Sequence, residues 1–192
     1  MSNMPNMLAY AVKGGLSSNY QPTIVVGQGK SGVSFYPQNA QDDTYWIAII
    51  DAMKPTTLVK DFLVPGSNNS SVPAGLDTYM TNPQYLFAVV TQCLSTLHVP
   101  QGAWYNYLVS HGAGRELQKL EELNASLSCG TYSSVSYLLT GSCGPTGGVN
   151  PPPPSYELGS YNNGVVLLMS LMPLPNGQGP YTLCDSYTFP TS

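Results

Sequence analysis

The chain has 192 residues, the size of one domain with a hydrophobic core of its own. Only 8% of these residues are charged, against roughly 25% in an average soluble protein. With six cationic residues and a net charge of −4, the sequence offers no basic patch for a nucleic acid and no polybasic segment for an anionic membrane surface. This composition is unusual for a metabolic enzyme and favours an extracellular β-rich protein, a lectin or a particle protein.

Residues 1–40 read as short strands separated by glycine turns. Within them, the GQGKSG stretch at 27–32 contains the Gly-Lys-Ser of a phosphate-binding loop. The full motif needs a glycine where Ile24 stands, and no helix pattern follows Ser31. We therefore expect a hairpin turn at this stretch and no nucleotide cofactor.

Two strands are predicted at 45–51 and 58–64, joined as a hairpin by the turn around Pro55. The first, YWIAIID, is almost wholly apolar, and the second alternates apolar and polar side chains. The following segment, 65–73, is polar and contains glycine, so we expect an exposed and mobile loop there.

The central third reads as strand, helix, helix, strand. A buried strand is predicted at 85–91, and a helix at 103–110 with Trp104, Tyr107, Leu108 and His111 on one face. Gly112-Ala113-Gly114 interrupts the helical pattern. A second helix begins at Arg115, with Leu117, Leu120, Leu123 and Leu127 as its apolar positions and Gly130 as its C-terminal cap, before a strand at 135–140.

The composition changes after Gly144. Four prolines at 151–154 predict a stiff connector, and two further strands are expected at 165–172 and 181–189. We expect residues 151–192 to pack back on a single domain, 1–150, as edge strands. The predicted fold is an α+β domain with sandwich-like antiparallel β-sheets, two central helices and a β-rich C-terminal arm.

The longest apolar run, 165–172, is less than half of the ~20 residues that a membrane-spanning helix needs. The N-terminal MSNMPNMLAYAVKGG lacks the basic start and the apolar stretch of a secretory signal. The composition nevertheless favours a secreted or particle-associated protein. Four cysteines (Cys93, Cys129, Cys143 and Cys184) lack the spacing of a zinc or redox site, and two disulfides or buried free thiols are both open.

The order of elements over residues 44–144 resembles the interleukin-like EMT inducer domain, also called the PANDER-like domain. The residues that carry the resemblance are Asp51, Asp77-Thr78-Tyr79, Gly112-Ala113 and Gly141. It implies a compact, non-enzymatic, sandwich-like α+β domain that binds a ligand or carbohydrate. Family members often have an acidic pair after the middle strand. Here Gln92-Cys93 stand in that place, which puts an acid-dependent ligand site in doubt.

Catalytic and metal sites find little support in the sequence. No GxSxG motif accompanies the two histidines, His98 and His111, and the sequence shows nothing that would lower the pKa of the Cys93 thiol. The acidic residues Asp42, Asp43 and Asp51 lack the spacing of a calcium loop. We expect neither a catalytic residue nor a metal.

Aromatic residues with nearby amides are typical of sugar sites, because an aromatic face packs on the C–H face of a pyranose. We expect ligand-binding side chains at Tyr79, Tyr105, Trp104, Asp77, His111 and Arg115. Trp104 fits the core face of its helix at least as well, whereas Tyr105 points to the other side and should be exposed. The leading interpretation is a carbohydrate-binding module. Its partner would be a glycan or a cell-surface ligand, and the chain itself would form homo-oligomers. The alternatives are an assembly subunit of a particle, fibre or secretion apparatus, and an unrecognised hydrolase.

Overall fold

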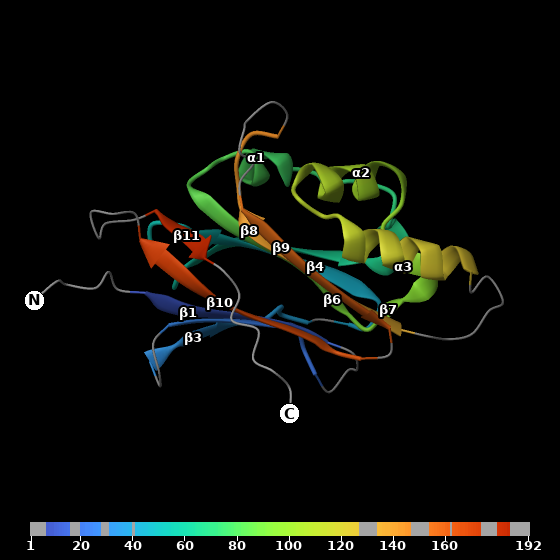
Figure 1. The fold of residues 1–192 in the computed structure, drawn as a ribbon, viewed down its shortest axis with the longest axis horizontal. Helices are drawn as coiled ribbons and strands as arrows, with labels where there is room; N and C mark the ends of the chain where they lie inside the picture. Colours follow the sequence, from blue (N-terminus) through green and yellow to red (C-terminus); the bar gives the residue numbers. More distant parts are fainter. Residues whose placement is uncertain are drawn as a thin grey trace, which may run out of the picture.

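The computed structural model describes residues 7–15, 20–27, 31–39, 41–126, 134–146, 154–161, 163–173 and 180–184. Two antiparallel sheets, of five and six strands, face each other, and the helices lie on the outer side of the six-stranded sheet (Figure 1). This is the α+β sandwich-like fold that the sequence predicted.

The five-stranded sheet combines strands from the two ends of the chain. In spatial order they are β11 (Tyr181–Cys184), β10 (Val165–Pro173), β1 (Leu8–Gly14), β2 (Thr23–Gly27) and β3 (Val33–Phe35). β2 and β3 pair antiparallel, as a hairpin requires. Residues 28–30 of the glycine-rich stretch between them lie outside the described residues.

The six-stranded sheet contains the four strands predicted between residues 45 and 140 and two strands that were not predicted, 94–95 and 155–161. They are β5 (Leu58–Pro65), β4 (Thr44–Asp51), β6 (Tyr85–Gln92), β7 (Leu94–Ser95), β8 (Ser134–Ser142) and β9 (Ser155–Tyr161). β6 and β7 pair with the same edge of β8, because β9 occupies its other edge. Cys93, with a φ of 44°, separates β6 from β7.

Helices follow the predicted pattern, with one addition. α2 (Gly102–Ser110) and α3 (Arg115–Ser126) correspond to the two expected helices, and the short α1 (Asp77–Met80) was not predicted. Gly112 separates α2 from α3 with a φ of +98°, and a Cβ there would lie 1.8 Å from Ser155 Oγ. The chain therefore needs glycine at this turn. Leu127 and the predicted cap at Gly130 lie outside the described residues.

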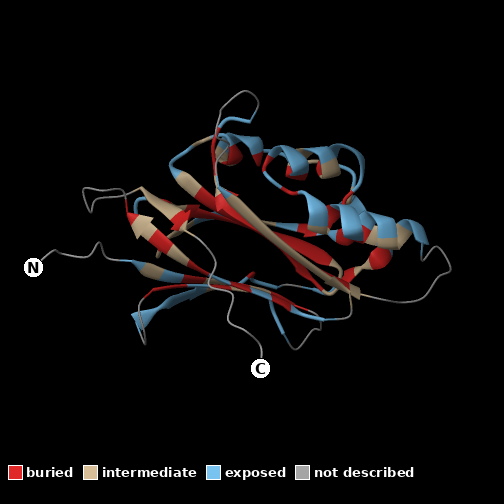
Figure 2. Ribbon diagram, in the orientation of Figure 1, coloured by how far each residue is buried: buried red, intermediate tan, exposed pale blue. Residues whose placement is uncertain are grey.

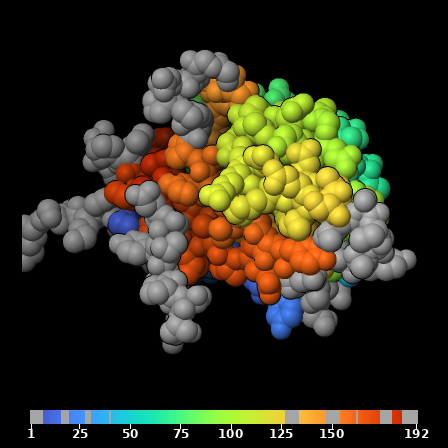
Figure 3. All heavy atoms as spheres, turned by 45° about the vertical axis from the view of Figure 1, so that its right-hand side comes forward, coloured from blue at the N-terminus to red at the C-terminus, as the bar shows by residue number. Residues whose placement is uncertain are grey.

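The C-terminal segment contributes to both sheets. β9 and β11 are edge strands, but β10 lies between β11 and β1, so the expectation that this segment forms only edges is wrong for β10. Its register with β1 runs from Leu8 opposite Leu171 to Gly14 opposite Val165, and most facing pairs are apolar, apart from Ala9 with Ser170 and Lys13 with Val166. Figure 3 shows the orange surface of this segment beside the yellow surface of α3. The predicted proline connector, apart from Pro154, lies outside the described residues.

The core has two parts, on the two faces of the six-stranded sheet (Figure 2). One face packs under the helices, with Trp104, Leu108, Leu117 and Leu120 among the buried side chains. The other face packs against the five-stranded sheet. β4, β6 and β8 are therefore covered on both sides, which explains their continuous apolar sequences.

Two further expectations concern the cysteines and the membrane. Cys93 and Cys143 are free thiols, so the four cysteines do not form two disulfides; Cys129 lies outside the described residues. Burial raises the pKa of the Cys143 thiol to about 12. Of the helices in the described ranges, none is long and apolar enough to cross a membrane.

Candidate functional site

Three of the six predicted site residues lie together under the helical layer. Trp104 is 1% exposed and meets Tyr45 edge to face, with ring centroids 6.1 Å apart. The ring of Tyr107 stacks on Trp104 at 5.9 Å and lies 4.3 Å from that of His111. The Tyr107 hydroxyl donates to Asp77 Oδ1 at 3.2 Å, which connects α2 to α1.

Trp104 and His111 of this group are buried, whereas Asp77 is exposed on α1. His111 is 8% exposed, its Nδ1 lies 2.8 Å from the carbonyl oxygen of Tyr107, and burial lowers the pKa of its imidazole. Burial likewise raises the pKa of Tyr107, and the Asp77 carboxylate adds to the shift. The core alternative that the sequence left open for Trp104 is the one the structure adopts.

The other three predicted residues lie apart from this group. Tyr79 is half-buried between Phe62 and Tyr85, with ring centroids 6.1 and 5.8 Å away. Tyr105 is also half-buried and packs against the core, so its predicted exposure is wrong. Arg115 is exposed at the start of α3. The six residues therefore do not form one aromatic platform.

A cleft of about 370 Å³ lies elsewhere, where β4 begins and β5 ends. We call it the Asp43 cleft. Its polar walls are Asn39, Gln41, Asp42, Asp43, Thr44 and Ser67. Leu63, Pro65 and Gly66 supply carbon surface. A volume above roughly 300 Å³ is in the range of small-molecule sites.

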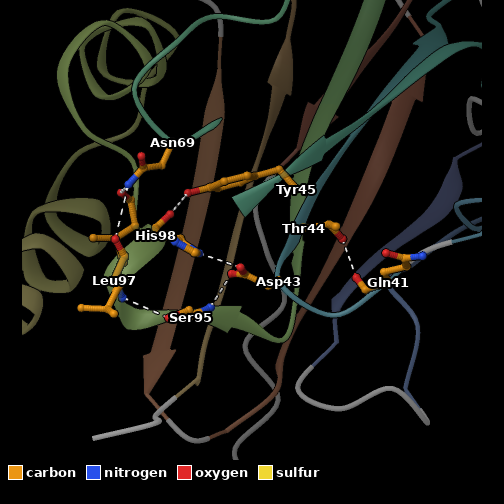
Figure 4. A network of polar contacts seen from close by, with 9 residues as sticks. Gln41, Asp43, Thr44, Tyr45, Asn69, Ser95, Leu97 and His98 are labelled. Atoms are coloured by element: carbon orange, nitrogen blue, oxygen red, sulfur yellow. Dashed lines mark hydrogen bonds and ion pairs between the residues drawn. The ribbon is translucent and has the colours of Figure 1, made fainter. Parts of the chain in front are cut away.

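Asp43 is the best-fixed side chain of the cleft (Figure 4). Its Oδ1 accepts the backbone N–H of Ser95 at 2.9 Å, and its Oδ2 lies 2.6 Å from Nδ1 of His98. The backbone N–H of Gly66 donates to the Asp43 carbonyl at 2.6 Å. Asp43 has a φ of 60°, a left-handed conformation that Asp and Asn adopt more readily than most residues.

These contacts also fix the surrounding loops. The hydroxyl of Tyr45 donates to the carbonyl of His98, and the side-chain amide of Asn69 donates to the carbonyl of Val99 at 2.9 Å. A Cβ on Gly66 would lie 2.4 Å from Asp43 Oδ1, so only glycine fits there. The segment 65–73, expected to be an exposed and mobile loop, is mostly exposed, contains a 3₁₀ helix (Gly66–Asn68) and is hydrogen-bonded to the β7–α2 connection.

The electrostatics of the cleft are acidic. Asp42 Oδ1 accepts a hydrogen bond from the Gln92 side-chain amide at 3.3 Å. Burial raises the pKa of the Cys93 thiol, and the carboxylates of Asp42 and Asp43 add to this although a hydrogen bond with Ser134 opposes it. Cys93 is therefore not an activated thiolate.

Metal and hydrolase chemistry were the remaining alternatives. Asp51 lies at the opposite end of β4 from Asp42 and Asp43, and its carboxylate accepts the N–H of Met53, so these three do not surround one ion. Across the described ranges, no group of three or more His, Cys, Asp or Glu side chains could hold a metal. His98 does reach a carboxylate, Asp43, which is the geometry a hydrolase would need.

Sequence reasoning considered Asp42 and Asp43 as a pair, did not connect them with His98, and missed the cleft. One local signal was present, because two adjacent aspartates before a buried strand often mark a constrained turn. The partners of Asp43, Ser95 and His98, are 52 and 55 residues away from it, and no spacing rule connects them.

No protein-family model matches this sequence, and a search of curated proteins finds no relative. The resemblance to the interleukin-like EMT inducer domain stays a prediction.

Proposed function

We propose that the chain is a non-enzymatic binding module that holds a neutral carbohydrate in the Asp43 cleft. The observation that carries the proposal is the composition of the cleft wall, where carboxylates, side-chain amides and hydroxyls surround a small carbon surface. Planar polar groups of this kind exchange paired hydrogen bonds with neighbouring sugar hydroxyls, and the carbon surface of Leu63 and Pro65 suits a C–H face of the ring.

The negative charge of the cleft disfavours anionic sugars as ligands. Asp42 and Asp43 are both in its wall, and none of the described residues that line it is cationic. A sialylated, sulfated or uronic sugar would place its own anion beside these carboxylates. Neutral sugars and amino sugars fit instead, since their hydroxyl and ammonium groups donate to carboxylate oxygens.

The hydrogen bonds of Asp43 favour binding by fixing its carboxylate before a ligand arrives. A carboxylate has about four acceptor positions, so the contacts with Ser95 and His98 leave others for a ligand. A side chain that is already ordered loses less conformational entropy on binding.

The same contacts argue for binding over hydrolysis. His98 is within reach of Asp43, but a hydrolytic dyad also needs a nucleophile. In the cleft wall, the Thr44 hydroxyl donates to the Gln41 carbonyl at 2.7 Å, and the nearby Cys93 has a raised pKa. Neither group is activated.

The test is a glycan array probed with the purified chain, followed by calorimetric titration of any hit. Gln41→Ala and Asp42→Asn should weaken binding roughly tenfold or more, as expected for losing a hydrogen bond to a charged or amide group. Gln118→Ala and Glu121→Gln, on the exposed side of α3, are the matched controls.

Two outcomes would contradict the proposal. Silence across the array would remove carbohydrate as the ligand class. Binding that is lost in Tyr79→Ala or Tyr105→Ala but kept in Gln41→Ala and Asp42→Asn would move the site to the helical layer.

A further inference from the structure

The two aspartates of the Asp43 cleft differ in how far their carboxylates are already used. Both oxygens of Asp43 have partners within the chain, the backbone N–H of Ser95 and the imidazole of His98 (Figure 4). Asp42 accepts one hydrogen bond at Oδ1, from the Gln92 side-chain amide, and its Oδ2 accepts none from the described residues. Asp42 is therefore the carboxylate with the greater free capacity for a ligand.

The charge of Asp42 is also unpaired. The ion pairs within the described ranges join His98 to Asp43 and Lys119 to Glu116, and neither includes Asp42. Asp42 is exposed in the cleft wall, where water and salt can reach its carboxylate. A cationic group that enters the cleft would therefore meet a carboxylate that no basic side chain already neutralises.

Gln92 orders Asp42 before a ligand arrives. This glutamine is 2% exposed at the end of β6, and its amide nitrogen donates to Asp42 Oδ1 at 3.3 Å. A Cβ on Gly15 would lie 2.4 Å from Oε1 of Gln92, so glycine at this position leaves room for the amide. A side chain that is already held in place loses less conformational entropy on binding.

Left-handed backbone conformations gather around the same cleft. Asn39 and Asp43, both in its wall, have a φ of 60°. Cys93 has a φ of 44°, and its carbonyl accepts the backbone N–H of Asp43 at 3.2 Å. These three are the non-glycine residues with positive φ in the part of the chain that the structure describes. Such conformations cost free energy and cluster at ligand sites, which supports a binding role for the cleft without reference to its charge.

We propose that the cleft prefers sugars with a free amino group to their neutral counterparts, and that Asp42 determines this preference. The inference rests on the carbohydrate-binding function proposed above. A protonated amine donates up to three hydrogen bonds, and its bond to a carboxylate adds the attraction of opposite charges. Asp42 accepts one of these bonds, and the side-chain amide oxygens of Asn39 and Gln41 are further acceptors in the same wall.

Other cations fit the cleft less well than an amino sugar. A metal ion needs several hard ligands, and the described residues contain no group of three or more His, Cys, Asp or Glu side chains that could hold one. A linear polyamine is flexible and loses more conformational entropy on binding than a sugar ring. The carbon surface of Leu63 and Pro65 suits the rigid C–H face of a ring beside the charged group.

The experiment is calorimetric titration of the purified chain with matched sugars, at a pH where the amine is protonated. Glucosamine is compared with glucose, and a chitosan oligomer with the N-acetylated oligomer of the same length. The amino sugar should bind roughly three- to tenfold more tightly than its neutral counterpart. This ratio should fall in high salt, because salt screens an exposed carboxylate.

Variants assign the preference to Asp42. Asp42→Asn removes the charge at nearly constant size, so it should weaken the amino sugar more than the neutral sugar and bring the ratio close to one. Asp42→Glu keeps the charge and should keep a preference. Gln41→Ala should weaken both sugars alike and leave the ratio unchanged, and Glu121→Gln on α3 is the matched control for a lost charge outside the cleft. Circular dichroism and thermal unfolding confirm that each variant is folded.

The outcomes separate this inference from the carbohydrate proposal. Equal affinity for the amino and the neutral sugar would overturn the preference and leave the carbohydrate site standing. A preference that survives in Asp42→Asn would overturn the role of Asp42. Putrescine bound as tightly as glucosamine would show a general amine site and overturn the selection of an amino sugar. No binding of any sugar, neutral or amino, would contradict the proposed function itself.

Discussion

Two nine-residue strands, β8 and β10, look alike in sequence and differ in their surroundings. β8, SVSYLLTGS, is buried at its seven inner positions because helices cover one of its faces and the five-stranded sheet covers the other. β10, VVLLMSLMP, alternates buried and accessible positions because only one face is covered. β10 is therefore more apolar than its surroundings in the single chain require. The comparison shows that an apolar strand sequence does not by itself tell whether one face of the strand or both faces are covered.

The largest predicted effect compares one leucine from each strand. Leu139 on β8 is fully buried, and Leu168 on β10 is 40% exposed. Leu139→Ala should lower the free energy of unfolding by about 2–5 kcal/mol, since it removes buried carbon and leaves a cavity. Leu168→Ala should cost less than about 1 kcal/mol, because the side chain is already partly exposed. Urea denaturation measures both. Equal losses in dilute protein would mean that β10 is covered within the single chain.

A smaller effect is expected at the end of the six-stranded sheet. Asp43→Ala removes the acceptor of the Ser95 N–H and of His98, and it places alanine at a φ of 60°. We expect a loss of about 2–4 kcal/mol, from the unpaired donors and the left-handed backbone together. Asp43→Asn tolerates the backbone and keeps one acceptor, so it should cost about 1 kcal/mol. If urea denaturation gives the same loss for both variants, then neither the left-handed backbone angle nor the acceptor that Asp43→Asn retains contributes to the free energy of unfolding.

The smallest effect is a pH dependence that belongs to the helix-covered face. Burial lowers the pKa of His111 below its ordinary value of 6.5, so the folded state favours neutral imidazole. As the pH falls through 6.5, the unfolded chain takes up the proton first, and the stability contribution present above that pH is progressively lost. The neighbours that face His111 are the rings of Phe87 and Tyr107, with Ser110 and, further away, Asp77.

Thermal unfolding between pH 7.5 and 5.5 measures this dependence. His111→Phe keeps the aromatic contacts and should flatten the curve, while His98→Asn should leave the contribution of His111 in place. A curve for His111→Phe that is as steep as that of the parent chain would assign the dependence to other groups.

The sequence predicted secondary structure best for the strands that are covered on both faces and for the amphipathic helices. The predicted strand at 85–91 became β6 with one more residue, and the predicted helices became α2 and α3 with starts within one residue. Continuous apolar runs and helical periodicity are local signals, and a strand or helix buried in the core preserves them. α1 escaped prediction because a four-residue helix is too short to show a period.

The candidate site was less predictable, since it depends on which segments meet. Asp42 and Asp43 were noticed as a pair before a strand, but the segment that completes the cleft begins at Leu63, 20 residues after Asp43. Aromatic content pointed to the helical layer instead. Trp104 and His111 are there because a helix packed on a sheet buries its apolar face, and the same spacing describes a core and a platform equally well.

The sequence by itself determined the class of the fold, four strands of the six-stranded sheet, the two main helices and the scarcity of charge, because these depend on local propensity and composition. Only the tertiary structure decided that β10 lies inside a sheet with one open face, and that Asp43 meets His98 across 55 residues. Strand order and long-range hydrogen bonds follow from how whole elements pack, and a linear pattern does not contain that information.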